Sequence, residues 1–146
     1  MTDDILNPDD PKHFRHATLH WEHDTVFRGG PPGGQEIVTD GRGDEGPDMV
    51  VLLLLAAGGC AGADVVSILK KMQAGLESLR IEVSGRRDPE PPKRYNHLTL
   101  RFVMRGTALT EANTARAVEL SVSKYCSVLR TLDPEMPVDT EIVIES

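Results

Sequence analysis

Apolar and polar residues alternate in the first third of the chain, which is typical of β-strands. Residues 15–21 place Leu19 and Trp21 on one face and polar side chains on the other, so they predict a half-buried strand. Shorter segments at 25–28 and 35–39 are bounded by glycine-rich turns and predict two more strands. We therefore expect a small three-stranded β-meander.

A continuous apolar run follows, and it predicts a helix. Residues 49–63 carry no charged side chain before Asp64, but the run is shorter than the 18 or more residues that a membrane span needs. We therefore interpret it as a buried core helix. Gly58 and Gly59 are unfavourable inside a helix by about 1 kcal/mol each. They predict either a kink or a close approach to the backbone, between helical segments at 49–57 and 60–72.

The second half of the chain contains both the alternating pattern of strands and the periodic apolar pattern of helices. Its patterns predict antiparallel strands at 79–84 and 97–105, a helix from Thr110 to about Tyr125, a short helical segment at 126–132 and a last strand at 138–145. Seven basic and three acidic side chains occur in 80–105, while Asp139 and Glu141 lie on the last strand. We expect these segments to be strand neighbours, because opposite charges attract across a sheet.

The composition fits one globular domain and limits the classes of molecule that the protein is expected to bind. The chain has 146 residues, 39% of them hydrophobic, a net charge of −7 and two cysteines. The negative charge argues against nucleic acid as a partner, and two cysteines exclude a multi-disulfide scaffold. Residues 1–14 are acidic and lack an apolar stretch, so we expect a flexible arm, no secretory signal and a cytoplasmic location, with one domain at 15–146.

Two motifs suggest a bound cofactor or metal, and both have simpler explanations. Residues 41–46 match G-x-G-x-x-G, but Asp44 and Glu45 would repel a pyrophosphate, so we expect an ordinary loop. His16, His20 and His23 are close in sequence, yet on a strand His23 faces away from the other two. We therefore expect neither a cofactor nor a metal ion.

Cys60 and Cys126 are the most informative polar positions. Each follows a predicted helix interruption, where free backbone N–H groups can lower the pKa of a thiol and favour the reactive thiolate. Asp64, one turn beyond Cys60, would oppose that effect by repulsion. The alternative is that both cysteines are small, inert core residues, because free cysteine is among the most buried residue types.

Two blocks around these cysteines resemble the OsmC/Ohr family. The first is the segment 46–72, with Gly58-Gly59-Cys60 at its centre, and the second is 116–128, with Lys124-Tyr125-Cys126. Together with His20-Trp21-Glu22, the resemblance extends over about residues 15–145. It is closest to an OsmC-like subgroup with a Gly-Gly-Cys core helix.

The resemblance implies an α+β OsmC-like fold, with antiparallel sheets, a buried central helix and an intertwined homodimer. It also implies a thiol peroxidase in oxidative-stress defence, whose substrate is a small organic hydroperoxide. Cys60 would attack the peroxide, Cys126 would resolve the sulfenic acid as a disulfide, and a dithiol reductant would restore both thiols. No membrane partner is expected.

One family feature is missing from this sequence. Members with well-defined peroxidase sites carry a glutamate near the start of the core helix, and Val50 or Val51 stands at that position here. Arg42 and Arg28 are candidates for a guanidinium that stabilises the thiolate. Two alternatives to the peroxidase remain open: a non-enzymatic module that binds a small hydrophobic ligand or senses redox state, and a structural dimer with inert thiols.

Overall fold

The computed structural model describes residues 14–146, so residues 1–13 of the expected arm lie outside the described part. The chain divides into two compact units, residues 1–52 and 53–146, and the division falls inside helix α2. Each unit is described by itself below. Strands and helices occur in both, and the predicted α+β class is confirmed.

The first unit contains the predicted β-meander. Strands β1 (Thr18–His23), β2 (Val26–Gly30) and β3 (Ile37–Asp40) form an antiparallel sheet in chain order. The prediction that the first strand is half-buried is wrong within this unit: every residue of β1 is exposed, including Leu19 at 61% and Trp21 at 66%. The strand lies at the edge of the sheet. The alternation in its sequence gives it an apolar face, but nothing in the described part of this unit covers that face.

Helix α2 (Met49–Lys71) runs unbroken through the glycine pair, so the predicted interruption is wrong. The other expectation for this position, a close approach to the backbone, is met at Gly58. A Cβ atom there would lie 2.7 Å from Val83 Cγ2 on the neighbouring strand, and one at Gly62 would lie 2.5 Å from Ile81 Cδ1. The absence of a side chain lets the helix pack closely on the sheet, which offsets the intrinsic cost of glycine.

The sheet of the second unit consists of β4 (Leu76–Arg87), β5 (Tyr95–Gly106) and β6 (Val138–Glu145), in that order. β4 and β5 are antiparallel as predicted. β6 lies beside β5, also as predicted, but the two run parallel, because the chain between them crosses over through helices. Arg101 on the middle strand forms ion pairs with Glu82 on one side and Glu141 on the other, at 2.9 and 3.7 Å.

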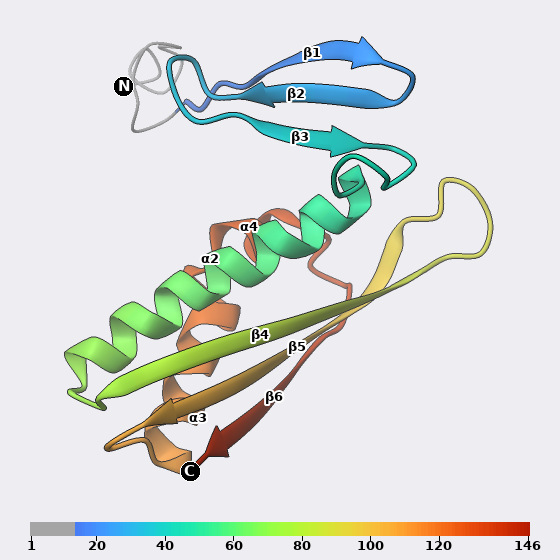
Figure 1. Cartoon of the computed structure of the whole chain (residues 1–146). Coiled ribbons are helices and arrows are strands. Elements are labelled where there is room, and N and C mark those ends of the chain that lie inside the picture. The colour runs from blue at the N-terminus through green and yellow to red at the C-terminus, as the bar shows by residue number, and fades with distance from the viewer. Residues whose placement is uncertain (1–13) are drawn as a thin grey trace, which may run out of the picture. The chain divides into compact units, whose positions relative to one another are not determined.

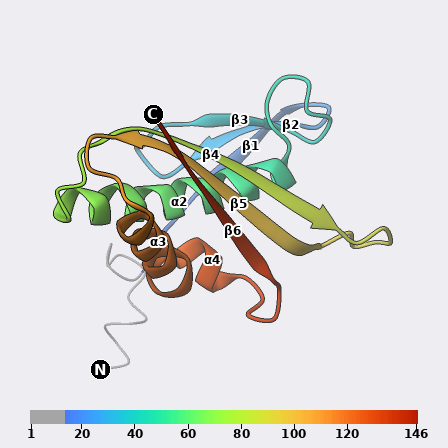
Figure 2. The same ribbon diagram turned by 90° about the horizontal axis from the view of Figure 1, so that it is seen from below.

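The crossover contains α3 (Glu111–Leu120), a π-helical turn η1 (Ser121–Tyr125) and the short helix α4 (Ser127–Thr131). Thr110 caps α3 as predicted, in a reciprocal pair of hydrogen bonds with Asn113. The π turn was not expected. Figures 1 and 2 show α2 and α3 on the same face of the sheet β4–β5–β6. The hydrophobic core lies between these helices and that sheet.

One side of α2 is buried and the other is not. Ala57, Ala61, Val65 and Leu69 are fully buried, whereas Leu55 and Val66 remain 59% and 44% exposed. The prediction of a buried core helix is therefore met on one side of α2. By length and composition α2 also passes for a membrane span, a test that core helices of soluble proteins pass too.

Candidate thiol site

The fold brings the two cysteines together within the second unit. Cys60 lies in the middle of α2 and is partly buried, and Cys126 is fully buried at the start of α4. The two thiols are close enough that each shifts the pKa of the other. The structure has both thiols free, so a pair of cysteines 66 positions apart in sequence forms a reduced dithiol site.

Cys126 stands after a helix interruption as predicted, but Cys60 does not. Since α2 is continuous, the free N–H groups near Cys60 are not those of its own helix. They come from the first turn of α4, where the backbone N–H groups of Ser127 and Val128 lower the pKa of Cys60. The Cys60 sulfur also lies 4.0 Å from the Ser127 hydroxyl oxygen.

These contacts give the two thiols different acidities. Burial disfavours the Cys60 thiolate, but the hydrogen bonds from Val128, Cys126 and Ser127 outweigh it, so the pKa of Cys60 is lowered. The pKa of Cys126 is raised to about 11, chiefly by burial; the contact with Cys60 contributes to the rise, and the backbone N–H groups of Leu129 and Val128 oppose it. Cys60 is therefore the thiol that ionises, and Cys126 is the thiol that donates to it.

Ser121, on the π turn, connects that turn to α2 through side-chain hydrogen bonds. Its side chain is fully buried, and its hydroxyl donates toward Ala61 O at 3.0 Å and Asp64 Oδ2 at 3.1 Å. Asp64 is the carboxylate that sequence reasoning placed in opposition to the Cys60 thiolate. In the structure that carboxylate accepts a hydrogen bond, which disperses part of its charge.

Sequence reasoning did not find Ser121, Ser127 or the backbone groups of α4. The only sequence signal for Ser127 is its position directly after Cys126. That position indicates no role unless one knows that Cys60 lies opposite. For Ser121 the signal is a polar residue on the otherwise apolar face of a predicted helix. Such a residue indicates a buried hydrogen bond but not its partner.

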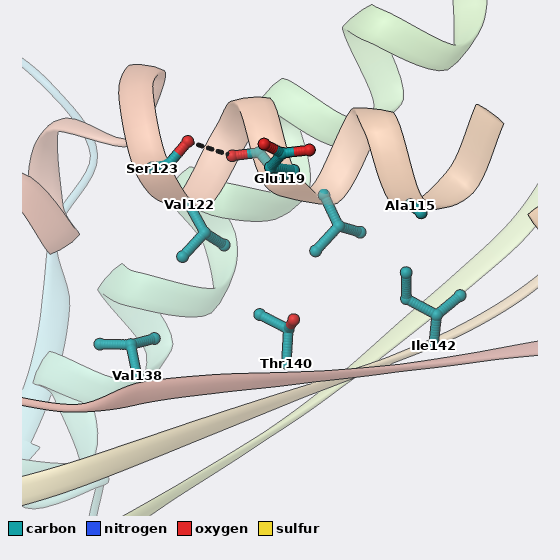
Figure 3. Close-up of a pocket in the computed structure, with 8 residues that line it drawn as sticks. Ala115, Glu119, Val122, Ser123, Val138, Thr140 and Ile142 are labelled. Carbon is teal, nitrogen blue, oxygen red and sulfur yellow. Dashed lines mark hydrogen bonds between the residues drawn. The ribbon is translucent and has the colours of Figure 1, made fainter. Parts of the chain in front are cut away.

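Two hollows lie near the site. One, of about 520 Å³, lies between α2 and the α3–η1 segment, and Asp64, Lys71 and Tyr125 are among its lining residues. The other, of about 380 Å³, lies between α3–η1 and β6 and is shown in Figure 3. Val138, Thr140 and Ile142 point into it from β6 and Val122 points into it from η1, so the lining is mostly apolar, and neither cysteine is part of it.

The glycine-rich loop of the first unit is held by one carboxylate. Asp40 is almost fully buried and accepts hydrogen bonds from the Thr25 hydroxyl and from the backbone N–H groups of Arg42, Asp44 and Glu45. These bonds lower the pKa of Asp40 to about 2. Since the loop's N–H groups already bind this internal anion, the match to a phosphate-binding motif reflects a self-contained turn.

The candidate arginines and histidines belong to the first unit as well. Arg28 lies 3.5 Å from Glu22 on the neighbouring strand, and a contact of either Arg28 or Arg42 with Cys60 stays a prediction. His23 lies 2.7 Å from Glu45, which raises the pKa of the imidazole. Between residues 14 and 146, no three side chains of the metal-binding types gather into a cluster.

The basic side chains at the end of β4 and in the loop before β5 make contacts within the chain. Arg86 donates to Asn96 at 2.8 Å, Arg87 to the Lys93 carbonyl at 2.7 Å, and Arg94 to Asp133 at 2.7 Å. These contacts bond the segment to its neighbours within the chain.

Comparison with known proteins identifies the family. The model of the family described as OsmC-like protein matches residues 41–141, which include both cysteines. The chain belongs to the OsmC-like protein family. Protein YhfA of Escherichia coli is 38% identical over 118 residues, which are 80% of this chain and 88% of YhfA.

Solved structures agree with the OsmC-like fold. A hypothetical protein from Aquifex aeolicus is 29% identical, with a TM-score of 0.81 and coverage of 90% of this chain and 96% of that one. The organic hydroperoxide resistance protein OhrB of Bacillus subtilis is 14% identical, with a TM-score of 0.57 and coverage of 90% and 97%. The second likeness concerns the fold alone. The closer placement in a Gly-Gly-Cys subgroup stays a prediction.

Proposed function

We propose that this OsmC-like protein is a thiol peroxidase that reduces small organic hydroperoxides in defence against oxidative stress. The observation that carries the proposal is the asymmetric dithiol, in which a Cys60 of lowered pKa faces a protonated Cys126. Family membership points in the same direction, since related structures carry names that refer to organic hydroperoxide resistance.

In the first step, the Cys60 thiolate attacks one oxygen of the peroxide. The O–O bond breaks, the alkoxide takes a proton and leaves as an alcohol, and Cys60 becomes a sulfenic acid. The N–H groups of Ser127 and Val128 support this step because they stabilise the thiolate in a site that is partly shielded from water. No metal or cofactor takes part.

In the second step, the sulfur of Cys126 attacks the sulfenic sulfur, and water leaves as the disulfide forms. The resting site keeps Cys126 protonated, partly through its contact with the Cys60 thiolate. Oxidation of Cys60 removes that negative charge, so the pKa of Cys126 falls when its thiolate is needed. A dithiol reductant then reduces the disulfide, restoring both thiols and becoming a disulfide itself.

The missing glutamate is the main departure from family members with defined peroxidase sites. Val50 or Val51 occupies its position, and the first turn of α2 has no acidic residue. Asp48, just before the helix, uses its carboxylate to cap it by accepting a hydrogen bond from Val51 N at 2.8 Å. In the proposed mechanism, hydrogen bonds from α4 stabilise the thiolate without this carboxylate.

We further propose that the protein is a homodimer. Leu19 and Trp21 on β1, and Leu55 and Val66 on α2, are more exposed than apolar side chains of this size usually are in a stable single chain. A second copy of the chain is the proposed cover. Light scattering is expected to give twice the chain mass for the wild type and a monomer for Leu55→Glu, with Glu135→Lys, an exposed loop change, remaining dimeric. A monomeric wild type would contradict this proposal.

Turnover of cumene hydroperoxide with a dithiol reductant tests the peroxidase proposal. The wild type is expected to consume peroxide, Cys60→Ser to be inactive, and Cys126→Ser to stop after one equivalent as a sulfenic acid. Ser127→Ala, which keeps the backbone N–H groups but loses the hydroxyl, is expected to retain part of the activity. Equal rates for the wild type and Cys60→Ser would contradict the proposal.

A second candidate function rests on the hollow in Figure 3. Its volume of about 380 Å³ and its apolar lining suit a small hydrophobic ligand, as a non-enzymatic binding module would require. This function predicts that Cys60→Ser binds such a ligand as the wild type does. Val122→Trp, which fills the hollow, would abolish binding.

A further inference from the structure

We propose that Ser121 is a positioning residue that holds Cys126 against Cys60. The inference goes beyond the proposed peroxidase in assigning a residue outside the thiol pair, and it rests on that function only through the disulfide that the pair would form. Two sets of hydrogen bonds support it: those of the buried Ser121 side chain and that of the Ser121 backbone carbonyl.

The hydroxyl of Ser121 fixes the position of the π turn relative to α2. It donates toward Ala61 O, the residue directly after Cys60, and toward the carboxylate of Asp64, one turn farther along. Both acceptors lie about 60 residues earlier in the sequence, so these are contacts between helices and not local bonds. Ser121 is fully buried, so water does not compete for them.

The carbonyl of Ser121 fixes Cys126. It accepts the Cys126 N–H at 2.8 Å, which is the bond five residues apart that defines a π turn. One residue is thus bonded through its side chain to the helix that carries Cys60 and through its backbone to Cys126. The wider π turn ends at Cys126, whose extended backbone then starts α4.

The consequence concerns the distance between the sulfurs. Disulfide formation requires narrow geometry, and a displacement of about 1 Å in a reacting group can slow a reaction by about a hundredfold. Without the hydroxyl, the π turn is joined to α2 at this point by packing alone. We expect Ser121→Ala to lower the effective concentration of Cys126 at Cys60 by about tenfold.

The neighbouring Ser123 supplies a matched control. It lies on the same π turn, but it is exposed and its hydroxyl donates locally to the Glu119 carbonyl at 2.6 Å, as Figure 3 shows. Ser123→Ala therefore removes a serine hydroxyl from the same turn without touching α2. Asp64→Asn and Asp64→Ala form a second pair, since asparagine keeps an acceptor for the Ser121 hydroxyl and alanine does not.

The test follows disulfide formation between Cys60 and Cys126 with the oxidant diamide. Diamide takes two hydrogen atoms from the two thiols and leaves one disulfide. This oxidant needs no peroxidase activity, so the comparison decides the role of Ser121 whether or not the protein turns over hydroperoxide. Intact mass gives the rate of disulfide formation, and equilibration with glutathione gives the effective concentration. A change in folding stability alone would not alter the effective concentration, provided that all variants are measured while folded.

The expected result is a loss of about tenfold in rate and effective concentration for Ser121→Ala, with Ser123→Ala within about twofold of the wild type. Asp64→Ala is expected to lose more than Asp64→Asn, and this pair decides the matter if Ser121→Ala does not fold. Values for Ser121→Ala within about twofold of the wild type would overturn the inference. So would a wild type that forms no disulfide with diamide.

Discussion

Cys60 and Ser127 are 67 residues apart in sequence, yet the Cys60 sulfur lies 4.0 Å from the Ser127 hydroxyl oxygen. The contact places the thiol of a mid-helix cysteine at the first turn of a different helix. It explains how a cysteine without a helix start of its own acquires a lowered pKa.

The asymmetry of the two thiols predicts a pH dependence. The alkylation rate of Cys60 by iodoacetamide should rise with pH around a midpoint below that of an ordinary thiol, because the thiolate is the reacting form. Cys126→Ala should move this midpoint upward, since Cys60 then loses a donor, while Cys126→Ser should move it less because a hydroxyl still donates. Identical profiles for the three proteins would contradict the hydrogen bond between the thiols.

The bonds to Asp40 predict how stability depends on pH. Its pKa is lowered from 3.8 to about 2 on folding, so its contribution is complete above pH 3.8 and disappears as the pH falls through about 2. Asp40→Asn should therefore lower the melting temperature at pH 7 and approach the wild type at low pH. Asp44→Asn, an exposed change in the same loop, should have little effect at either pH. An Asp40→Asn protein as stable as the wild type at pH 7 would disagree with this account.

Close packing at Gly58 predicts that a small side chain is harmful there. Gly58→Ala gains about 1 kcal/mol of helix propensity, but the added methyl group meets Val83 at 2.7 Å, and overpacking costs about 1–3 kcal/mol. We expect a net loss in the free energy of unfolding, measured with urea, while Ser67→Ala on the exposed side of α2 should not destabilise. Val83→Ala should relieve the loss in the double variant, and additive effects would argue against this contact.

Most elements that were predicted correctly depend on local pattern. The meander and the Thr110 cap follow from residues near one another in sequence, whereas the place of the last strand beside β5 follows from the opposite charges of two distant segments. The family blocks likewise identified both cysteines. The unbroken α2 could not be predicted, because Val83 decides whether Gly58 bends the helix or packs tightly, and Val83 lies on another element.

The details of the site escaped prediction for the same reason. Sequence reasoning expected the N–H groups near Cys60 at a break in its own helix, whereas they belong to Ser127 and Val128. The π turn depends on Ser121 reaching across to Ala61 and Asp64, a contact that periodicity does not encode. A residue's type is visible in the sequence, but its partner on another helix is not.

Intact-protein mass spectrometry after one equivalent of cumene hydroperoxide tests the central claim most directly. The account predicts a mass lower by two hydrogen atoms in the wild type, with peptide mapping that joins Cys60 to Cys126, and no such loss in Cys60→Ser or Cys126→Ser. A wild-type mass that stays unchanged, or one that gains oxygen at Cys60 without forming the disulfide, would contradict it.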